Sequence, residues 1–198
     1  MITVRKYREA DKENLQKICI ATGPGIKNER HRLSQLALYC DYFADCEPEN
    51  IFIAADEADN AVGYILCCTN FAGFKTAMKK HYFKFTCRYD IVKWLMCRAE
   101  LIMDEKLFKD YGAFLHIDIL DGYQRAGVGT RLMDALLALL LEKGIKGVTL
   151  GVGSDNVKGV SFYKKYGFHV VKQGPGFYKL GIFTTERQQT DREKQHET

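Results

Sequence analysis

Residues 113–143 read AFLHIDILDGYQRAGVGTRLMDALLALLLEK, and this stretch decides the fold. It opens on Ala113 to Leu120, whose composition is typical of a central β-strand. A glycine-containing turn follows, and then a strongly apolar run from Thr130 to Lys143 that is typical of a helix. Gly144 stands where a C-terminal helix cap belongs. The stretch therefore predicts a strand, a tight turn and a helix in succession.

A turn of this kind is suited to binding phosphate. Glycine lets the backbone approach a ligand without a Cβ in the way. The following helix begins with unpaired N–H groups and with the positive end of its dipole. Together these features form an anion site, and Arg125 adds a mobile positive charge.

Two well-known glycine-rich turns do not fit this one. A phosphate-binding P-loop requires Gly-x4-Gly-Lys-Ser/Thr, and here Val128-Gly129 follows Gly127 in place of Lys-Ser/Thr. The dinucleotide-binding fingerprint requires a third glycine, where this chain has Leu132. That fingerprint also belongs after the first strand of a parallel unit, whereas this turn comes late in the chain.

A third motif matches. Gln124-Arg125-Ala126-Gly127-Val128-Gly129 resembles the Gln/Arg-x-x-Gly-x-Gly/Ala signature of the GNAT superfamily of acyl-CoA-dependent acetyltransferases. The second half of that pattern, Asn-x-x-Ala-x-x-x-Tyr-x-x-x-Gly-Phe, is matched by Asn156, Gly159, Tyr163, Gly167 and Phe168, with Gly159 in place of alanine. The resemblance covers roughly residues 2–182. More narrowly, the chain resembles bacterial-type acetyltransferases that are similar to the acetyltransferase-like domain of O-GlcNAc hydrolases.

The resemblance implies a single α/β (α+β) domain over residues 1–185, with a mixed, mostly antiparallel twisted sheet of six or seven strands flanked by helices. It also implies acetyl-CoA as cosubstrate and no metal. The pantetheine arm would pair with the backbone of the central strand, backbone amides of the turn would hold the pyrophosphate, and Asn156 would hydrogen-bond the cofactor. The residues implied to bind the cofactor are Ile117, Ile119, Gln124, Arg125, Ala126, Gly127, Val128, Gly129, Thr130, Asn156 and Tyr163.

Acetyl transfer to an amine makes its own chemical demands. A lysine-type amine is neutral in only about one molecule in 2500 at pH 7, so a base must remove a proton. The leaving thiolate needs a proton donor, and a tyrosine with a pKa of about 10 stays protonated at neutral pH. The resemblance places Tyr163 beside the thioester sulfur, where it suits that role. Tyr163 could alternatively be a core side chain.

His116 and Asp118 are the candidate bases, because they lie two residues apart on one face of the central strand. The alternative is a hydrogen-bonded pair that orders the sheet. The superfamily often places a carboxylate further up this strand, where this chain has Tyr111 and Ala113.

The rest of the chain reads as alternating strands and helices. Strands are expected at 2–6, 51–55, 62–67, 148–152, 169–172 and 177–182, and helices from Asp11 as N-cap, over 29–44, over 91–103 and over 157–166. Residues 70–109 carry nine Lys/Arg against four Asp/Glu, and we expect a basic elaboration there, near a substrate or cofactor entrance or as a solvated helical face. Residues 186–198 are polar and patternless and are expected to be disordered.

Composition narrows the function classes. The chain has 198 residues, 46% hydrophobic content and a net charge of +4, which suits one domain and does not require nucleic acid. Seven cysteines occur without Cys-x-x-Cys or zinc-ligand spacing, so reduced, mostly buried thiols in a cytoplasmic protein are expected. The longest apolar run is too short to span a membrane.

The sequence therefore predicts an acetyl-CoA-dependent N-acetyltransferase that acts by direct attack of an amine in a ternary complex. Its partners would be acetyl-CoA and an unidentified amine acceptor, without nucleic acid or membrane, in a monomer or homodimer. Two alternatives stay open at this point: a non-catalytic acyl-CoA-binding pseudoenzyme or sensor, and a nucleic-acid-binding module built on residues 70–109.

Overall fold

The computed structural model of the chain describes residues 1–23, 25–82 and 91–186. Apart from Glu186, the tail expected to be disordered lies outside these residues, as does Cys87. The six described cysteines are free thiols, and four of them are buried: Cys19, Cys40, Cys67 and Cys68.

Seven strands form one mixed sheet in the order β1-β2-β3-β4-β5-β7-β6. Neighbouring strands are antiparallel except β4 and β5, which run parallel. The predicted mixed, mostly antiparallel sheet is therefore confirmed. The strands are β1 (Thr3–Lys6), β2 (Phe52–Ala55), β3 (Ala61–Cys68), β4 (Phe114–Ile119), β5 (Gly147–Gly153), β6 (His169–Gly174) and β7 (Phe177–Phe183).

The two parallel strands separate almost at once. β3 and β4 are paired along six positions, from Gly63 opposite Ile119 to Cys68 opposite Phe114. Between β4 and β5 the described ladder holds a single pair, Phe114 opposite Thr149. Beyond that pair the two strands diverge, so their facing backbone edges lack a partner strand.

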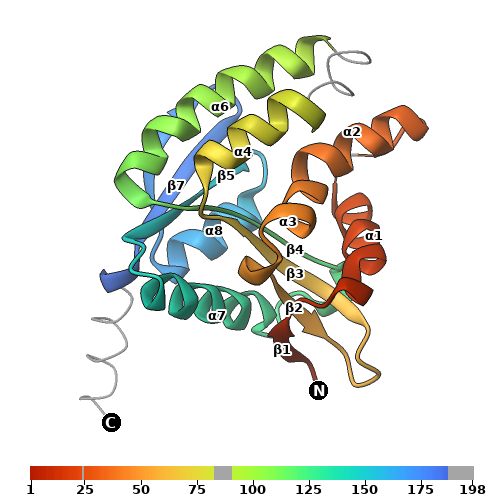
Figure 1. Ribbon diagram of the computed structural model, residues 1–198. Helices are drawn as coiled ribbons and strands as arrows, with labels where there is room; N and C mark the ends of the chain where they lie inside the picture. The colour runs from red at the N-terminus through yellow and green to blue at the C-terminus, as the bar shows by residue number, and fades with distance from the viewer. Residues whose placement is uncertain (24, 83–90, 187–198) are drawn as a thin grey trace.

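Helices cover both faces of the sheet (Figure 1). The core on one face is formed with α7 and α8, and the core on the other face is formed with the remaining helices, including α6 from the basic segment. The helices are α1 (Lys12–Thr22), α2 (Glu29–Tyr39), α3 (Asp41–Cys46), α4 (Phe71–Ala77), α6 (Ile91–Tyr111), α7 (Val128–Glu142) and α8 (Val157–Tyr166), with a π-helical turn over Met78–Tyr82.

Helix α7 forms because its apolar residues recur at helical spacing. Six of its side chains are buried against the sheet, and each fully buried leucine contributes roughly 1.5–3 kcal/mol. The helix begins at Val128 rather than at the predicted Thr130, because Gly127 at φ +72° supplies the N-cap position. The buried residues are Val128, Leu132, Met133, Leu136, Leu137 and Leu140.

Three sequence predictions were wrong in detail. The expected helix over 29–44 is two helices, because Cys40 leaves helical geometry and lets the adjacent Tyr42 and Phe43 both be buried. Asp11 occupies the N-cap position of α1, as expected, but its side chain makes no capping bond there; its carboxylate accepts hydrogen bonds from Arg5 at 2.7 and 2.8 Å and from the backbone N–H of Arg8 at 2.8 Å.

The third error concerns the helix expected over 91–103, which continues to Tyr111. The Tyr111 ring stacks on Phe183 with the ring centroids 4.6 Å apart. Gly112, at φ +92°, then turns the chain into β4. Tyr111 is therefore an anchor of the long helix on β7 and not an upstream residue of the central strand.

Candidate active site

The turn before α7 has the form of an open anion site. Arg125 and Gly127 have φ of +64° and +72°, and no heavy atom lies within 4 Å of a Cβ built on Gly127. No side chain caps α7, and its first turn contains no acidic residue. Its positive end and the N–H groups of its first turn therefore face solvent.

Gln124 holds this turn against the end of β4. Its side-chain amide donates to the backbone carbonyl of Ile119 at 2.9 Å and to Asp121 Oδ1 at 3.1 Å. The structure therefore gives Gln124 a positioning contact, while its neighbours Arg125 and Ala126 are exposed.

The start of α7 lies against both β4 and α8. An ideal Cβ on Gly129 would lie 3.0 Å from the ring of Phe162 and 3.5 Å from the side chain of Ile119. The glycine therefore brings the turn, the divergent part of β4 and the helix that carries Tyr163 close together.

Asn156 caps α8. Its Oδ1 accepts a hydrogen bond from the backbone N–H of Gly159 at 2.9 Å. A Cβ on Gly159 would lie 2.7 Å from the side-chain nitrogen of Asn156, so the glycine that replaces the family's alanine makes room for this conformation. The contact between Asn156 and a cofactor stays a prediction.

Tyr163 projects from α8 between aromatic neighbours, with its ring centroid 5.3 Å from that of Phe162 and 5.8 Å from that of Phe168. Burial raises the pKa of the Tyr163 phenol, and the charge of Asp118 raises it further. The phenol is therefore protonated at neutral pH and can donate a proton or a hydrogen bond.

The two candidate bases have different surroundings. Asp118 Oδ2 accepts a hydrogen bond from the Tyr64 hydroxyl at 2.5 Å. Burial raises the pKa of Asp118, whereas hydrogen bonds from Tyr64 and Thr22 oppose that rise. Asp118 is thus hydrogen-bonded to β3 through Tyr64 and to α1 through Thr22.

His116 instead lines a cavity. Its ring makes edge-to-face contacts with Tyr39, Phe43 and Phe114, at centroid distances of 5.5, 5.5 and 6.2 Å. Burial lowers the pKa of His116 to about 4, and the nearby Glu100 carboxylate opposes that effect. The imidazole is therefore neutral at pH 7, with one ring nitrogen unprotonated.

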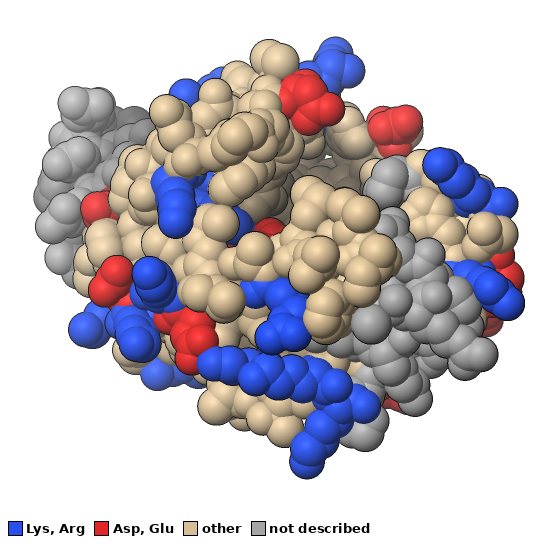
Figure 2. Space-filling view, turned by 90° about the horizontal axis from the view of Figure 1, so that it is seen from above, with Lys and Arg blue, Asp and Glu red and all other residues tan. Residues whose placement is uncertain are grey.

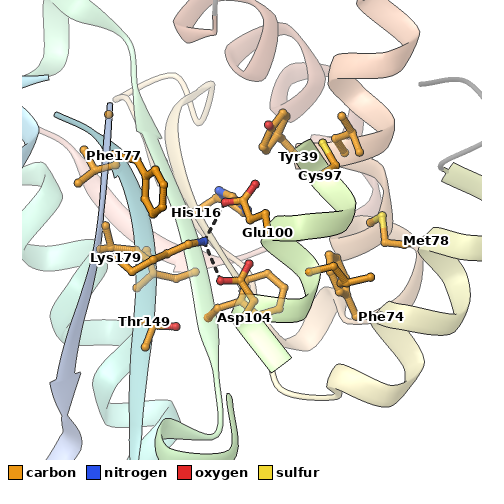
Figure 3. A pocket seen from close by; sticks show the side chains of 18 residues that line it. Tyr39, Phe74, Met78, Cys97, Glu100, Asp104, His116, Thr149, Phe177 and Lys179 are labelled. Carbon is orange, nitrogen blue, oxygen red and sulfur yellow. Dashed lines mark hydrogen bonds and ion pairs between the residues drawn. The ribbon is translucent and has the colours of Figure 1, made fainter. Parts of the chain in front are cut away.

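The cavity has a volume of about 300 Å³ and lies over the point where β4 and β5 separate (Figure 3). Its walls come from α2, α4, α6, β4, β5 and β7 and are mostly apolar. Polar groups enter it from α2, α6, β4 and β7. The lining residues are Leu38, Tyr39, Phe74, Met78, Cys97, Glu100, Leu101, Asp104, Phe114, Leu115, His116, Thr149, Leu150, Gly151, Val152, Gly153, Phe177 and Lys179.

Three charged residues in this cavity were missed from the sequence. Lys179 on β7 is 6% exposed and forms ion pairs of 2.8 Å with Glu100 and 2.7 Å with Asp104, both on α6. The available signals were a lysine inside the apolar strand Phe177–Phe183 and two carboxylates four residues apart on one helix face. Nothing local linked residues that lie 79 positions apart.

A family model described as the acetyltransferase (GNAT) family matches residues 24–168. The chain belongs to this family. The parting of β4 and β5 and the uncapped helix beside it are where the GNAT resemblance had placed the cofactor.

Solved structures agree on the fold. A crystal structure described as SsHAT is 28% identical, with a TM-score of 0.80 over 92% of this chain and 98% of that one. PaiA N-acetyltransferase from Thermoplasma acidophilum in complex with coenzyme A is 17% identical, with a TM-score of 0.58 over 92% and 99%. The polyamine N-acetyltransferase of Drosophila melanogaster is 13% identical, with a TM-score of 0.62 over 92% and 100%. The narrower resemblance to O-GlcNAc hydrolase domains stays a prediction.

Two further observations concern the described part of the chain. Within it, no helix has the length and apolar character needed to cross a membrane. Among the same residues, no cluster of three or more His, Cys, Asp and Glu side chains is arranged to hold a metal ion.

Proposed function

We propose that this GNAT-family chain transfers the acetyl group of acetyl-CoA to a primary amine, by direct attack in a ternary complex. The observation that carries the proposal is the single-pair contact between β4 and β5. It leaves a gap in the sheet with a positive helix end at one side and a cavity with polar groups at the other.

The residues present fit the cofactor. A diphosphate would be held by backbone N–H groups of residues 125–130 and by the α7 dipole, since Gly127 leaves open space there. A pantetheine arm, which carries amides, would pair with the unpartnered edge of β4 at Ile117 and Ile119. Asn156 follows β5 and stands at the other side of the gap. Bound there, acetyl-CoA supplies the activated acyl group.

Two side chains suit the proton transfers. His116 lines the cavity, so by position it is the better placed of the two candidate bases to take a proton from the incoming ammonium group. Tyr163 stays protonated and would donate to the departing thiolate. Overall the nitrogen–carbon bond forms, the carbon–sulfur bond breaks, and one proton is released to solvent. Asp118 would order the strand through Tyr64.

The proposal is tested by combining calorimetry with CoA and a thiol-release assay with acetyl-CoA and a panel of primary amines. We expect micromolar CoA binding and amine-dependent thiol release that exceeds the rate of hydrolysis without amine. Tight binding with no turnover on any amine would favour the non-catalytic acyl-CoA binder. Absence of binding by well-folded protein would reject both.

A further inference from the structure

The charged group inside the cavity has more negative than positive charge. Lys179 is one cation shared by Glu100 and Asp104 (Figure 3). The other residues that line the cavity carry no formal charge while His116 is neutral. With both carboxylates ionised, the cavity wall therefore has a net charge of −1.

Glu100 is the member of this group that is free to bind something else. Its side chain is 45% exposed, whereas those of Asp104 and Lys179 are 15% and 6% exposed. Lys179 is held by its Oε1 atom, which leaves Oε2 without a hydrogen bond from the described residues. A carboxylate oxygen on a mostly apolar wall favours a cationic hydrogen-bond donor.

The position of Glu100 coincides with the parting of the strands. Gly151 lies on β5 beyond its last pair with β4, and an ideal Cβ there would be 3.5 Å from Glu100 Oε1. The charge of Glu100 also acts on His116, on the facing strand. The carboxylate therefore stands between the two divergent strands, beside the candidate base.

Among the described residues, no basic side chain of the segment 70–109 lines this cavity. Lys75, Lys79 and Arg98 line a separate groove that also contains Trp94 and Leu101. Seen from above, the surface is hollowed, and Lys and Arg side chains gather in several groups over this face, one of them in the lower part of the view (Figure 2). These described basic side chains therefore do not favour an anionic acceptor in the cavity.

Resting on the proposed function, we infer that Glu100 binds the ammonium group of the acceptor and that the cavity selects primary amines on an unbranched apolar stem. Acceptors with a carboxylate or phosphate beside the amine are disfavoured, because they would bring a second negative charge to Glu100. The cavity volume of about 300 Å³ is at the low end for ligand pockets and corresponds to roughly ten water molecules. It suits an acetyl group together with one alkylamine arm.

The experiment uses three probes of matched length: n-pentylamine, 1-pentanol and hexanoate. Binding is measured by NMR titration to protein loaded with CoA, so that no transfer can occur. We expect the wild type to bind pentylammonium at least tenfold more tightly than hexanoate. Glu100→Gln should remove that preference and leave the CoA affinity unchanged, while Glu100→Asp should retain part of it.

Glu105→Gln is the matched control, because Glu105 lies on the same helix but pairs with Lys75 in the other groove. In Glu100→Gln, Lys179 keeps its ion pair with Asp104, and thermal unfolding checks that the fold persists. Equal binding of pentylammonium to wild type and Glu100→Gln, or preference for hexanoate, would overturn the inference. If CoA itself does not bind, the proposed function fails, and the same titrations without CoA still decide the role of Glu100.

Discussion

Lys179 lies directly opposite Gly151 in the ladder between β7 and β5, and an ideal Cβ on Gly151 would be 3.1 Å from the lysine Nζ. The lysine side chain thus crosses above a residue that has no side chain. The Lys179 ammonium group of β7 can therefore reach Glu100 and Asp104 of α6, near His116.

Gly151→Ala should disturb that crossing. The new methyl group would press on Lys179 and Glu100, so we expect kcat/KM for the amine to fall by roughly 10- to 100-fold, because small misplacements near reacting groups are costly. CoA affinity measured by calorimetry should stay unchanged. Gly122→Ala is the control, since nothing lies within 4 Å of its Cβ position. Unchanged amine kinetics in Gly151→Ala would show that this arrangement does not matter for turnover.

Tyr163→Phe should lower kcat by about 10²-fold or more, the usual contribution of a positioned proton donor, with CoA affinity kept. The comparison is Tyr166→Phe on the same helix as Tyr163, which removes a hydroxyl that donates to Asp134 of α7 at 2.6 Å. That variant should lose stability rather than rate. Equal kcat in wild type and Tyr163→Phe would leave Tyr163 with a packing role.

Gly129→Val should weaken CoA binding by roughly tenfold or more. Its side chain would meet the ring of Phe162 and push the start of α7 away, which misplaces the N–H groups that face the diphosphate. Calorimetry gives the affinity, and circular dichroism reports whether the fold is retained. A folded Gly129→Val protein with wild-type affinity would contradict the assignment of this turn as the diphosphate site.

His116→Phe should make the protein less sensitive to acid. The folded pKa of His116 is about 4, below the ordinary value of 6.5, so the unfolded chain takes up the proton first as pH falls. The wild type therefore loses stability between about pH 6.5 and pH 4, by an amount on the order of 1–3 kcal/mol.

The measurement is the free energy of unfolding by urea at pH 7, 5.5 and 4.5. Burial raises the pKa of Asp104 to about 6, which makes stability fall as pH rises from about 4 to 6, the opposite sign. Asp104 is present in both proteins, so its effect largely cancels in the difference. A difference in unfolding free energy that is independent of pH would contradict the lowered pKa of His116.

Local patterns predicted most of the fold. The strand composition of β4, the apolar run of α7 and the glycines after α7 and α8 lie within short windows, and the structure places each where it was expected within a few residues. The break at Cys40 could not be read, because tertiary packing of Tyr42 and Phe43 overrides a continuous helical pattern.

The candidate site was predictable only where it follows the chain. Residues 124–130, Asn156 and Tyr163 belong to a motif with fixed spacing, so the sequence could name them. Glu100 and Lys179 meet because a long helix, inserted between β3 and β4, lies against β5 and β7. The sequence signals on each side, a lysine in an apolar strand and two carboxylates on one helix face, do not show that the two elements meet.

The single-pair contact between β4 and β5 also bears on the rigidity of the sheet. Within the described residues, only the pair Phe114–Thr149 joins β4 to β5, so few backbone contacts hold the two halves of the sheet together there. A ligand that hydrogen-bonds to the open edges of both strands would join the two halves of the sheet and restrict their relative motion. The rigidity of the sheet would then depend on the bound ligand. Amide hydrogen exchange in β4 and β5 would become slower when the ligand is bound.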